Sequence, residues 1–167
     1  PDRLWTGGNY IWRTNDKGQT WDRASDAMPE GSSITAFGVA NGDSDNVLVG
    51  TSRGFIVHNK AAGETQSDTQ WHPSQPVLGN VSSVTFDPNN SQIAYATYST
   101  FGVNHVWKSE NGGVTWKAID NLGADNGIPD IPVHTIVVDP SDSKRLYVGT
   151  DLGLFVSFDG GDNWVVE

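Results

Sequence analysis

The stretch Thr14-Asn15-Asp16-Lys17-Gly18-Gln19-Thr20-Trp21 decides the fold of this chain, because the chain repeats it. It returns as Ser109-Glu110-Asn111-Gly112-Gly113-Val114-Thr115-Trp116 and as Ser157-Phe158-Asp159-Gly160-Gly161-Asp162-Asn163-Trp164. With Trp71 in the gap, successive tryptophans are 50, 45 and 48 residues apart. Four-stranded propeller blades repeat at about 40 to 50 residues. The spacing therefore predicts an all-β protein, built of β-propeller blades that are four-stranded antiparallel meanders.

Short apolar runs recur in a fixed order around each phrase. β-Branched and aromatic residues fill these runs, and Gly, Asn and Asp-Pro separate them, which is typical of strands. We name the strands of one blade A, B, C and D, with the phrase between C and D. The A, B and C runs are residues 34–39, 47–51 and 55–58; 84–88, 93–97 and 105–109; and 136–140, 146–150 and 154–157. Residues 4–7 and 10–13 repeat B and C alone, and the D runs are residues 20–23, 115–119 and 164–167.

These runs predict 15 strands, which is just under four blades. The approximate blades are residues 1–32 (partial), 33–80, 81–131 and 132–167 of a single propeller segment. The second blade has lost the phrase, and a polar loop at residues 59–70 replaces it. Because the first blade lacks strand A, we expect the segment to belong to a larger ring of about seven blades, completed by the same protein or by a second chain.

Composition excludes several classes of function. The formal net charge is −10, and the ten Lys and Arg residues form no cluster larger than Lys144-Arg145, which argues against binding to nucleic acid or to anionic membranes. No apolar segment approaches the length of a membrane span, so no membrane insertion is expected. The chain has no cysteine, which excludes disulfides, thiolate zinc sites and cysteine nucleophiles. Divalent cations and neutral sugars remain compatible ligands.

The repeated phrase has a structural explanation. Its Asp or Asn can accept hydrogen bonds from turn amides, and Ser or Thr can do the same. Its glycine suits a positive φ, and its tryptophan can cover the seam between blades. The alternative is that Asp16 or Asp159 is catalytic or binds a metal. On the structural reading the important residues are Thr14, Asp16, Gly18, Trp21, Ser109, Asn111, Gly113, Trp116, Ser157, Asp159, Gly161 and Trp164.

The phrase resembles the Asp-box, or BNR repeat, Ser/Thr-x-Asp-x-Gly-x-Thr-Trp. Residues 14–21 match every position, whereas Asn111 replaces Asp in the second copy and Asn163 replaces Thr in the third. The chain thus resembles Asp-box β-propellers, which include sialidases, xyloglucanases, sortilin-type receptors and the photosystem II assembly factor. Residues 131–157 look like blades of large secreted bacterial proteins. The resemblance implies a propeller that is secreted or displayed on a bacterial surface, and it covers enzymes and non-enzymes alike.

The residues favour a non-enzyme over a glycoside hydrolase. Sialidases need three converging arginines, a Tyr nucleophile helped by Glu, and an Asp acid, but only Arg53 of the five arginines lies in a B–C loop. A xyloglucanase needs two Asp residues facing across a groove, and neither motif can be matched residue by residue. Catalytic residues are therefore unassigned.

Blade geometry places D–A and B–C loops on one edge of each sheet and the repeated phrase on the other. Tyr98 and Phe101 beside Asn104 suit a sugar platform, unless the aromatics only pack on a neighbouring blade. Residues 120–130 hold three carboxylates and two Asn, which suits Ca²⁺ or a solvated turn. We expect residues 43–46 to form an A–B turn, and the histidines to be structural or exposed, with no metal ligand assigned. The ligand-binding candidates are Arg53, Tyr98, Phe101, Asn104, His105, Asp125, Asp130 and Asp151.

Two functions follow as hypotheses. The first is a non-catalytic scaffold that binds a protein or a glycan through the D–A and B–C loops. The alternative is a fragment of a secreted glycoside hydrolase, xyloglucanase-like or sialidase-like, whose catalytic carboxylates lie partly in further blades. A third hypothesis is an assembly factor for a larger complex.

Overall fold

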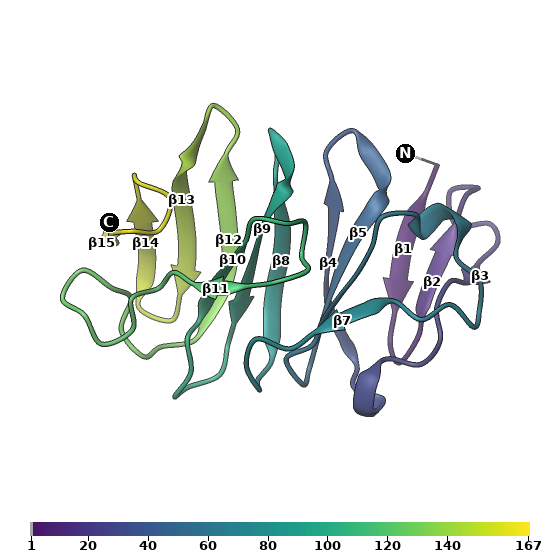
Figure 1. The fold of residues 1–167 in the computed structure, drawn as a ribbon, viewed down its shortest axis with the longest axis horizontal. Coiled ribbons are helices and arrows are strands. Elements are labelled where there is room, and N and C mark those ends of the chain that lie inside the picture. The colour runs from purple at the N-terminus through teal and green to yellow at the C-terminus, as the bar shows by residue number, and fades with distance from the viewer. Residues whose placement is uncertain (1) are drawn as a thin grey trace.

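The chain forms four twisted antiparallel sheets that stand side by side (Figure 1). The structure is a computed structural model that describes residues 2–167; Pro1, which begins the predicted first blade, lies outside the described residues. The first sheet holds β1 (Leu4–Gly7), β2 (Ile11–Thr14) and β3 (Asp22–Arg23). The second holds β4 (Ile34–Ala40), β5 (Asp43–Thr51), β6 (Ile56–Asn59) and β7 (His72–Ser74). The third holds β8 (Val81–Asp87), β9 (Asn90–Tyr98), β10 (Val106–Ser109) and β11 (Lys117–Ala118), and the fourth β12 (Val133–Asp139), β13 (Asp142–Thr150), β14 (Gly153–Ser157) and β15 (Val165–Val166).

Each sheet is a simple meander, so the predicted propeller blades are confirmed. Strand order follows chain order in every sheet, and all strand pairs are antiparallel. The A strands β4, β8 and β12 lie against one another, and the D strands lie at the opposite margin of each sheet. The sheets stack along the chain from the purple N-terminal blade to the yellow C-terminal blade (Figure 1). Residues 2–167 also contain the 3₁₀ helices η1 (Pro29–Gly31) and η2 (Ala62–Glu64) and no helix long and apolar enough to cross a membrane.

Neighbouring blades bury both faces of the sheets between them. Val47, Val49 and Val57 of the second blade pack toward Ile11 of the first. The alternate residues of the same strands, such as Leu48, belong to the cluster shared with the third blade. Burial on both faces explains why these strands are continuously apolar rather than alternating.

The B strands begin earlier than the sequence analysis expects. Asp43 starts β5 and pairs with Ala40, so residues 43–46 are strand and the turn is reduced to Asn41-Gly42. This corrects the expected acidic turn. Asp43 and Ser44 lie at the solvent-exposed end of the hairpin, where no apolar pattern marks a strand. The D strands β3, β11 and β15 are shorter than expected, at two residues each.

The three repeated turns (residues 14–21, 109–116 and 157–164) share one hydrogen-bond scheme. In the first, the Thr14 Oγ1 hydroxyl donates to Asp16 Oδ1 at 2.7 Å and accepts from the Gly18 N–H at 2.9 Å. Asp16 Oδ1 and Oδ2 accept from the N–H and the hydroxyl of Thr20 at 2.9 and 2.6 Å. Hydrogen bonds from the Thr20 side chain and backbone, and from Thr14, lower the pKa of Asp16 to about 2. The carboxylate is thus used to hold the turn.

The other two turns reproduce this scheme with different residues. Asn111 Oδ1 accepts from the Thr115 N–H at 2.9 Å while its Nδ2 donates to the Thr115 hydroxyl. Asp159 Oδ1 accepts from the Asn163 N–H at 2.9 Å, and Asn163 Nδ2 donates to Asp159 Oδ2. The substitutions within the phrase therefore change the chemical groups and keep the bonds. Gly18, Gly113 and Gly161 all have positive φ, at 90°, 95° and 104°.

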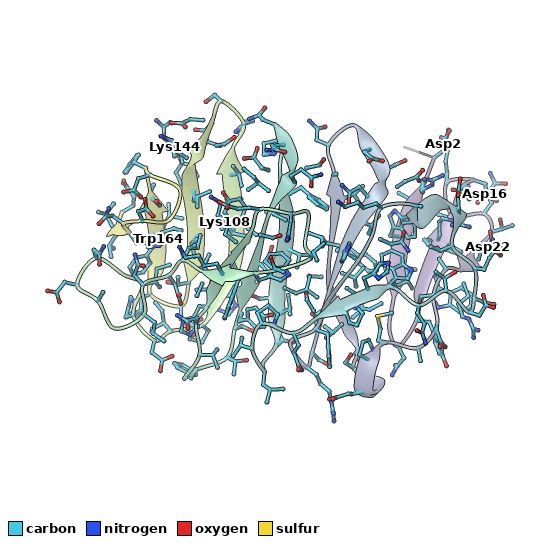
Figure 2. All side chains as sticks on the ribbon, viewed as in Figure 1. Asp2, Asp16, Asp22, Lys108, Lys144 and Trp164 are labelled. Atoms are coloured by element: carbon cyan, nitrogen blue, oxygen red, sulfur yellow. The ribbon has the colours of Figure 1, made fainter. Side chains whose placement is uncertain are left out.

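The tryptophans join each blade to the one before it. Trp164 Nε1 donates to the Ile119 carbonyl at 2.7 Å, and Trp71 Nε1 donates to the Ala24 carbonyl at 2.9 Å. Both acceptors follow a D strand of the preceding blade. Trp21 belongs to the first blade and is 38% exposed, whereas Trp164 is 4% exposed. Figure 2 shows Trp164 and Asp16 toward opposite ends of the stacked sheets.

Candidate functional site

The B–C and D–A loops form one continuous edge, which we call the loop edge (residues 7–10, 24–33, 52–55, 75–80, 99–105, 119–132 and 151–152). In each complete blade, the first residue of the B–C loop donates its N–H to the carbonyl of the residue immediately before strand A. The bonds are Ser52 to Ser33 O (2.8 Å), Ser99 to Asn80 O (3.0 Å) and Asp151 to Pro132 O (3.4 Å). The A–B turns and the repeated turns lie at the opposite edge, which is uppermost for the A–B turns in Figure 1. The last repeated turn nevertheless contacts the long D–A loop, because Asn121 Nδ2 and Asn126 Nδ2 donate to the Asp162 carbonyl at 2.8 and 3.1 Å.

The last blade breaks a pattern that the second and third blades keep. Thr35 Oγ1 donates to the Val81 carbonyl, and Ser82 Oγ donates to the Val133 carbonyl, both at 2.6 Å. These bonds tie each A strand to the next one. The fourth blade has His134 at this register, and its Nε2 lies 2.6 Å from Asp151 Oδ1. Both side chains are half exposed, so this pair is presented to solvent at the loop edge.

Two of the predicted ligand-binding residues are buried, and a third is exposed. Tyr98 is completely buried, and its hydroxyl donates to the Gly54 carbonyl at 3.0 Å. Burial also raises the pKa of the Tyr98 phenol far above its usual range. His105 is completely buried as well. These positions correct the expectation that either residue meets a ligand, because neither has any surface at the loop edge. Phe101 remains as the exposed aromatic of that predicted pair.

His105 lies between two carboxylates that come from the connection to the last blade. Its Nδ1 is 3.4 Å from Asp120 Oδ2, and its Nε2 is 3.2 Å from Asp130 Oδ1. The His105 N–H and Asn104 Nδ2 donate to the two oxygens of Asp120 at 2.5 and 2.8 Å. The Gly102 N–H donates to Asp130 Oδ1 at 2.7 Å. This network fixes the long D–A loop onto the B–C loop of the third blade, and it occupies Asn104, His105 and Asp120.

The loop at residues 119–132 encloses a shallow, open hollow of about 590 Å³. Leu122 and Pro129 supply apolar walls, and Asp125 and Asp130 supply carboxylates. Within residues 2–167, no three His, Asp or Glu side chains gather closely enough to hold a metal ion. The calcium site that the sequence allowed in this loop therefore lacks its ligand cluster, since Asp120 is turned into the buried network.

Three large apolar side chains stand exposed along the loop edge: Leu78 (69%), Phe101 (64%) and Leu152 (70%). Hydrogen bonds join the loops that carry these side chains to one another. The Asn80 N–H donates to Thr100 Oγ1 at 2.9 Å, which joins the loop of Leu78 to the loop of Phe101. The bonds from Gly102 to Asp130 and from Asp151 to Pro132 continue these links to the loop of Leu152.

The loop edge has one guanidinium, and it is already paired. Arg53 Nη1 lies 3.4 Å from Glu30 Oε2, and both side chains are exposed. Among residues 2–167, no Lys or Arg forms an ion pair with Asp125, Asp130 or Asp151. These three carboxylates, together with exposed Asp26 at the first blade, are therefore the charges without a Lys or Arg partner that the loop edge offers to a ligand.

The structure places some predicted candidates together and adds residues that the sequence analysis missed. Phe101, Asp130 and Asp151 share the surface described above, and Asp125 lines the adjoining hollow, whereas Arg53 lies at the second blade. His134, Leu78 and Leu152 were not predicted. His134 could have been found by aligning the A strands, because Thr35 and Ser82 hold the same register.

Comparisons with known proteins support the fold. No family model matches the chain, and no curated protein matches its sequence. Among solved structures, an ancestral GH74 enzyme matches 99% of the chain with a TM-score of 0.74 and 19% identity. YCF48 from Cyanidioschyzon merolae matches 90% with a TM-score of 0.64 and 18% identity, and YCF48 bound to D1 peptide matches 98% with a TM-score of 0.54 and 14% identity. The chain spans 22%, 44% and 64% of these three proteins, respectively. The similarity establishes a β-propeller fold.

Proposed function

We propose that this chain is a non-catalytic Asp-box propeller module, secreted or displayed on a cell surface, that binds a protein or glycan through its loop edge. The observation that carries the proposal is the contrast between the two edges. The repeated turns use their polar groups to stabilise themselves, while the loop edge exposes Leu78, Phe101 and Leu152 near carboxylates that have no Lys or Arg partner. Exposed apolar groups rimmed by polar ones are typical of interaction sites. One similar structure, YCF48, is bound to a peptide.

A binding screen with matched variants tests this function. The purified chain is probed against a glycan array and a displayed peptide library. Any ligand found is then measured against a loop-edge variant, Phe101→Ser, and a variant of the repeated turns, Val114→Ser, whose side chain is also exposed. The proposal expects weaker binding only for Phe101→Ser. Equal loss in both variants, or no ligand in either screen, contradicts it.

We further propose that other blades, in the same protein or in a second chain, cover the open faces of the end blades. Val47 and Val57 of the second blade are buried against the first blade. Leu4 and Trp12 occupy the same registers in the first blade, and both are more than a third exposed. Sedimentation of the chain tests this proposal: self-association that Trp12→Glu abolishes supports it, whereas a stable monomer unaffected by the substitution contradicts it.

A glycoside hydrolase fragment is the second candidate function. It is favoured by the match of 99% of the chain to an ancestral GH74 enzyme and by the exposed His134–Asp151 pair. A xyloglucanase from Xanthomonas campestris also shares the fold, with a TM-score of 0.53. Reducing-end release from xyloglucan by the purified chain, abolished in Asp151→Asn, would establish hydrolysis. No release above buffer would leave the binding function as the better proposal.

A further inference from the structure

The loops that carry the exposed apolar residues of the loop edge are hydrogen bonded to loops with carboxylates that have no Lys or Arg partner. Leu78, Phe101, Asp130, Asp151 and Leu152 form this surface, which we call the Phe101 stripe. Its members come from the loops of three successive blades, because the B–C and D–A loops of neighbouring blades are hydrogen bonded to one another. The stripe is therefore a product of the blade arrangement.

Hydrogen bonds and histidine contacts fix the two carboxylates of the stripe in position. Asp130 accepts from the Gly102 N–H and contacts buried His105, so the carboxylate and the backbone beside Phe101 are fixed relative to each other. His134 fixes Asp151 by the 2.6 Å contact between Nε2 and Oδ1. Preorganised groups bind with a smaller loss of conformational entropy than mobile ones. The stripe is better suited to recognition than a set of mobile surface side chains.

The chemistry of the stripe and its adjoining hollow defines the ligand. The hollow joins apolar walls, Leu122 and Pro129, to carboxylates, Asp125 and Asp130. A lysine or arginine side chain matches this arrangement, because its apolar stem can pack on the walls while its cationic head reaches a carboxylate. Neutral sugars would use the aromatic ring but would leave Leu78 and Leu152 without matching groups. Phosphorylated or acidic ligands would meet like charge, since the chain has a net charge of −10.

We propose that the Phe101 stripe binds a cationic peptide segment of a partner protein, with apolar side chains on Leu78, Phe101 and Leu152 and Lys or Arg at Asp125, Asp130 and Asp151. This inference rests on the proposed function and names the partner class for the same edge. The charges supply attraction and register, and the exposed apolar side chains supply the buried contact area. A peptide without positive charge loses the contacts with the carboxylates, and a peptide without apolar residues loses the contacts with the exposed apolar side chains.

Fluorescence anisotropy with three labelled peptides of equal length tests the proposal. One peptide combines Lys with Leu, one combines Lys with Ser, and one combines Glu with Leu. We expect the Lys/Leu peptide to bind at least about tenfold more tightly than either of the others, and its affinity to fall with added salt because exposed charges are screened. If the Lys/Ser peptide bound as tightly as the Lys/Leu peptide, net charge alone would explain the binding, and the proposal would be overturned.

Variants separate the stripe from the rest of the acidic surface. Asp125→Asn with Asp151→Asn should weaken the Lys/Leu peptide and flatten its salt dependence, and Phe101→Ser with Leu152→Ser should weaken it about tenfold. Glu110→Gln with Val114→Ser, on the second repeated turn, is the matched control and should change nothing. Thermal unfolding of each variant confirms that it is folded. Loss in the control, or no loss at the stripe, overturns the proposal; a glycan that binds at the loop edge while the peptide does not would overturn it and leave the proposed function standing.

Discussion

The two edges of the sheets differ in how faithfully they repeat. In the repeated turns, an acceptor oxygen of Asp16, Asn111 or Asp159 makes the same pair of bonds in three blades. At the loop edge, the equivalent A-strand register holds Thr35 and Ser82 and then His134, and the bonds change with the residue. Geometry that stabilises a blade tends to recur, and this turn does so in three of the four blades. Residues that depart from the repeat are free of that requirement, which is why the search for function belongs at the loop edge.

The same comparison can be made within the repeated turns, between the first and the last copy. The two turns have equivalent hydrogen bonds, yet Trp164 is buried against the preceding blade and Trp21 is not. The tryptophan therefore contributes to the interface between blades, and the rest of the phrase contributes to the turn.

The largest expected effect is at the buried tryptophan. Trp164→Ala removes a buried indole and its hydrogen bond to the Ile119 carbonyl, and should lower the free energy of unfolding by about 3–5 kcal/mol. Trp21→Ala removes a side chain that is already partly in solvent, and should cost about 1 kcal/mol. Urea unfolding of both variants measures the difference. Equal losses would contradict the view that the indole acts between blades.

A pair of glycines gives the next largest effect. Gly54 and Gly153 occupy the same place in their B–C loops and both have positive φ, at 84° and 123°. A Cβ at Gly54 would collide with the Val77 carbonyl, whereas a Cβ at Gly153 would meet open space. We expect Gly54→Ala to lower the free energy of unfolding by about 3 kcal/mol and Gly153→Ala by about 1 kcal/mol, from backbone strain alone. Matching values would mean that the last blade is as closely packed at this edge as the second.

The sequence predicted the fold well, because the fold depends on features that recur. The tryptophan spacing, the phrase and the apolar runs all indicate the same repeat. The 15 predicted strands are present. Strand bounds were less well predicted, since residues such as Asp43 pair in a solvent-exposed hairpin that carries no apolar signal.

The candidate site was predicted only in part, because burial at loops depends on contacts between blades. Tyr98 and Phe101 are three residues apart and look alike in sequence, yet the Tyr98 hydroxyl reaches Gly54 in the preceding blade while Phe101 stands in solvent. The role of Asp120 was hidden for the same reason, since its partners Asn104 and His105 are 15 to 16 residues away along the chain. Comparing registers between blades recovers His134, and this information is already present in the sequence.

Histidine chemistry gives a smaller effect in the second blade, where the repeated turn is missing. Burial, followed by the neighbouring His72 and Lys60, lowers the pKa of His58 below its ordinary value of 6.5. The unfolded chain therefore binds more protons at His58 than the folded chain does. The free energy of unfolding should be at its full value above about pH 6.5 and should decline as the pH falls below it. His58→Gln should flatten that part of the stability–pH curve. An unchanged slope between pH 7 and pH 5 would show that His58 is not the group responsible.

The smallest expected effect is a substitution that one copy of the phrase has already made. Asp16→Asn should retain both contacts with Thr20, because Asn111 accepts from the Thr115 N–H and, with donor and acceptor reversed, donates its Nδ2 to the Thr115 hydroxyl. At neutral pH the free energy of unfolding should change little. In acid the two proteins should differ: the pKa of Asp16 is lowered to about 2 by Thr20 and Thr14, so the wild-type contribution is present above about pH 4 and is lost as the pH falls toward 2. Asparagine has no such titration, and denaturant unfolding at several acidic pH values measures the difference. Identical acid profiles for the two proteins would mean that the charge on Asp16 contributes nothing beyond the oxygen that Asn111 also provides.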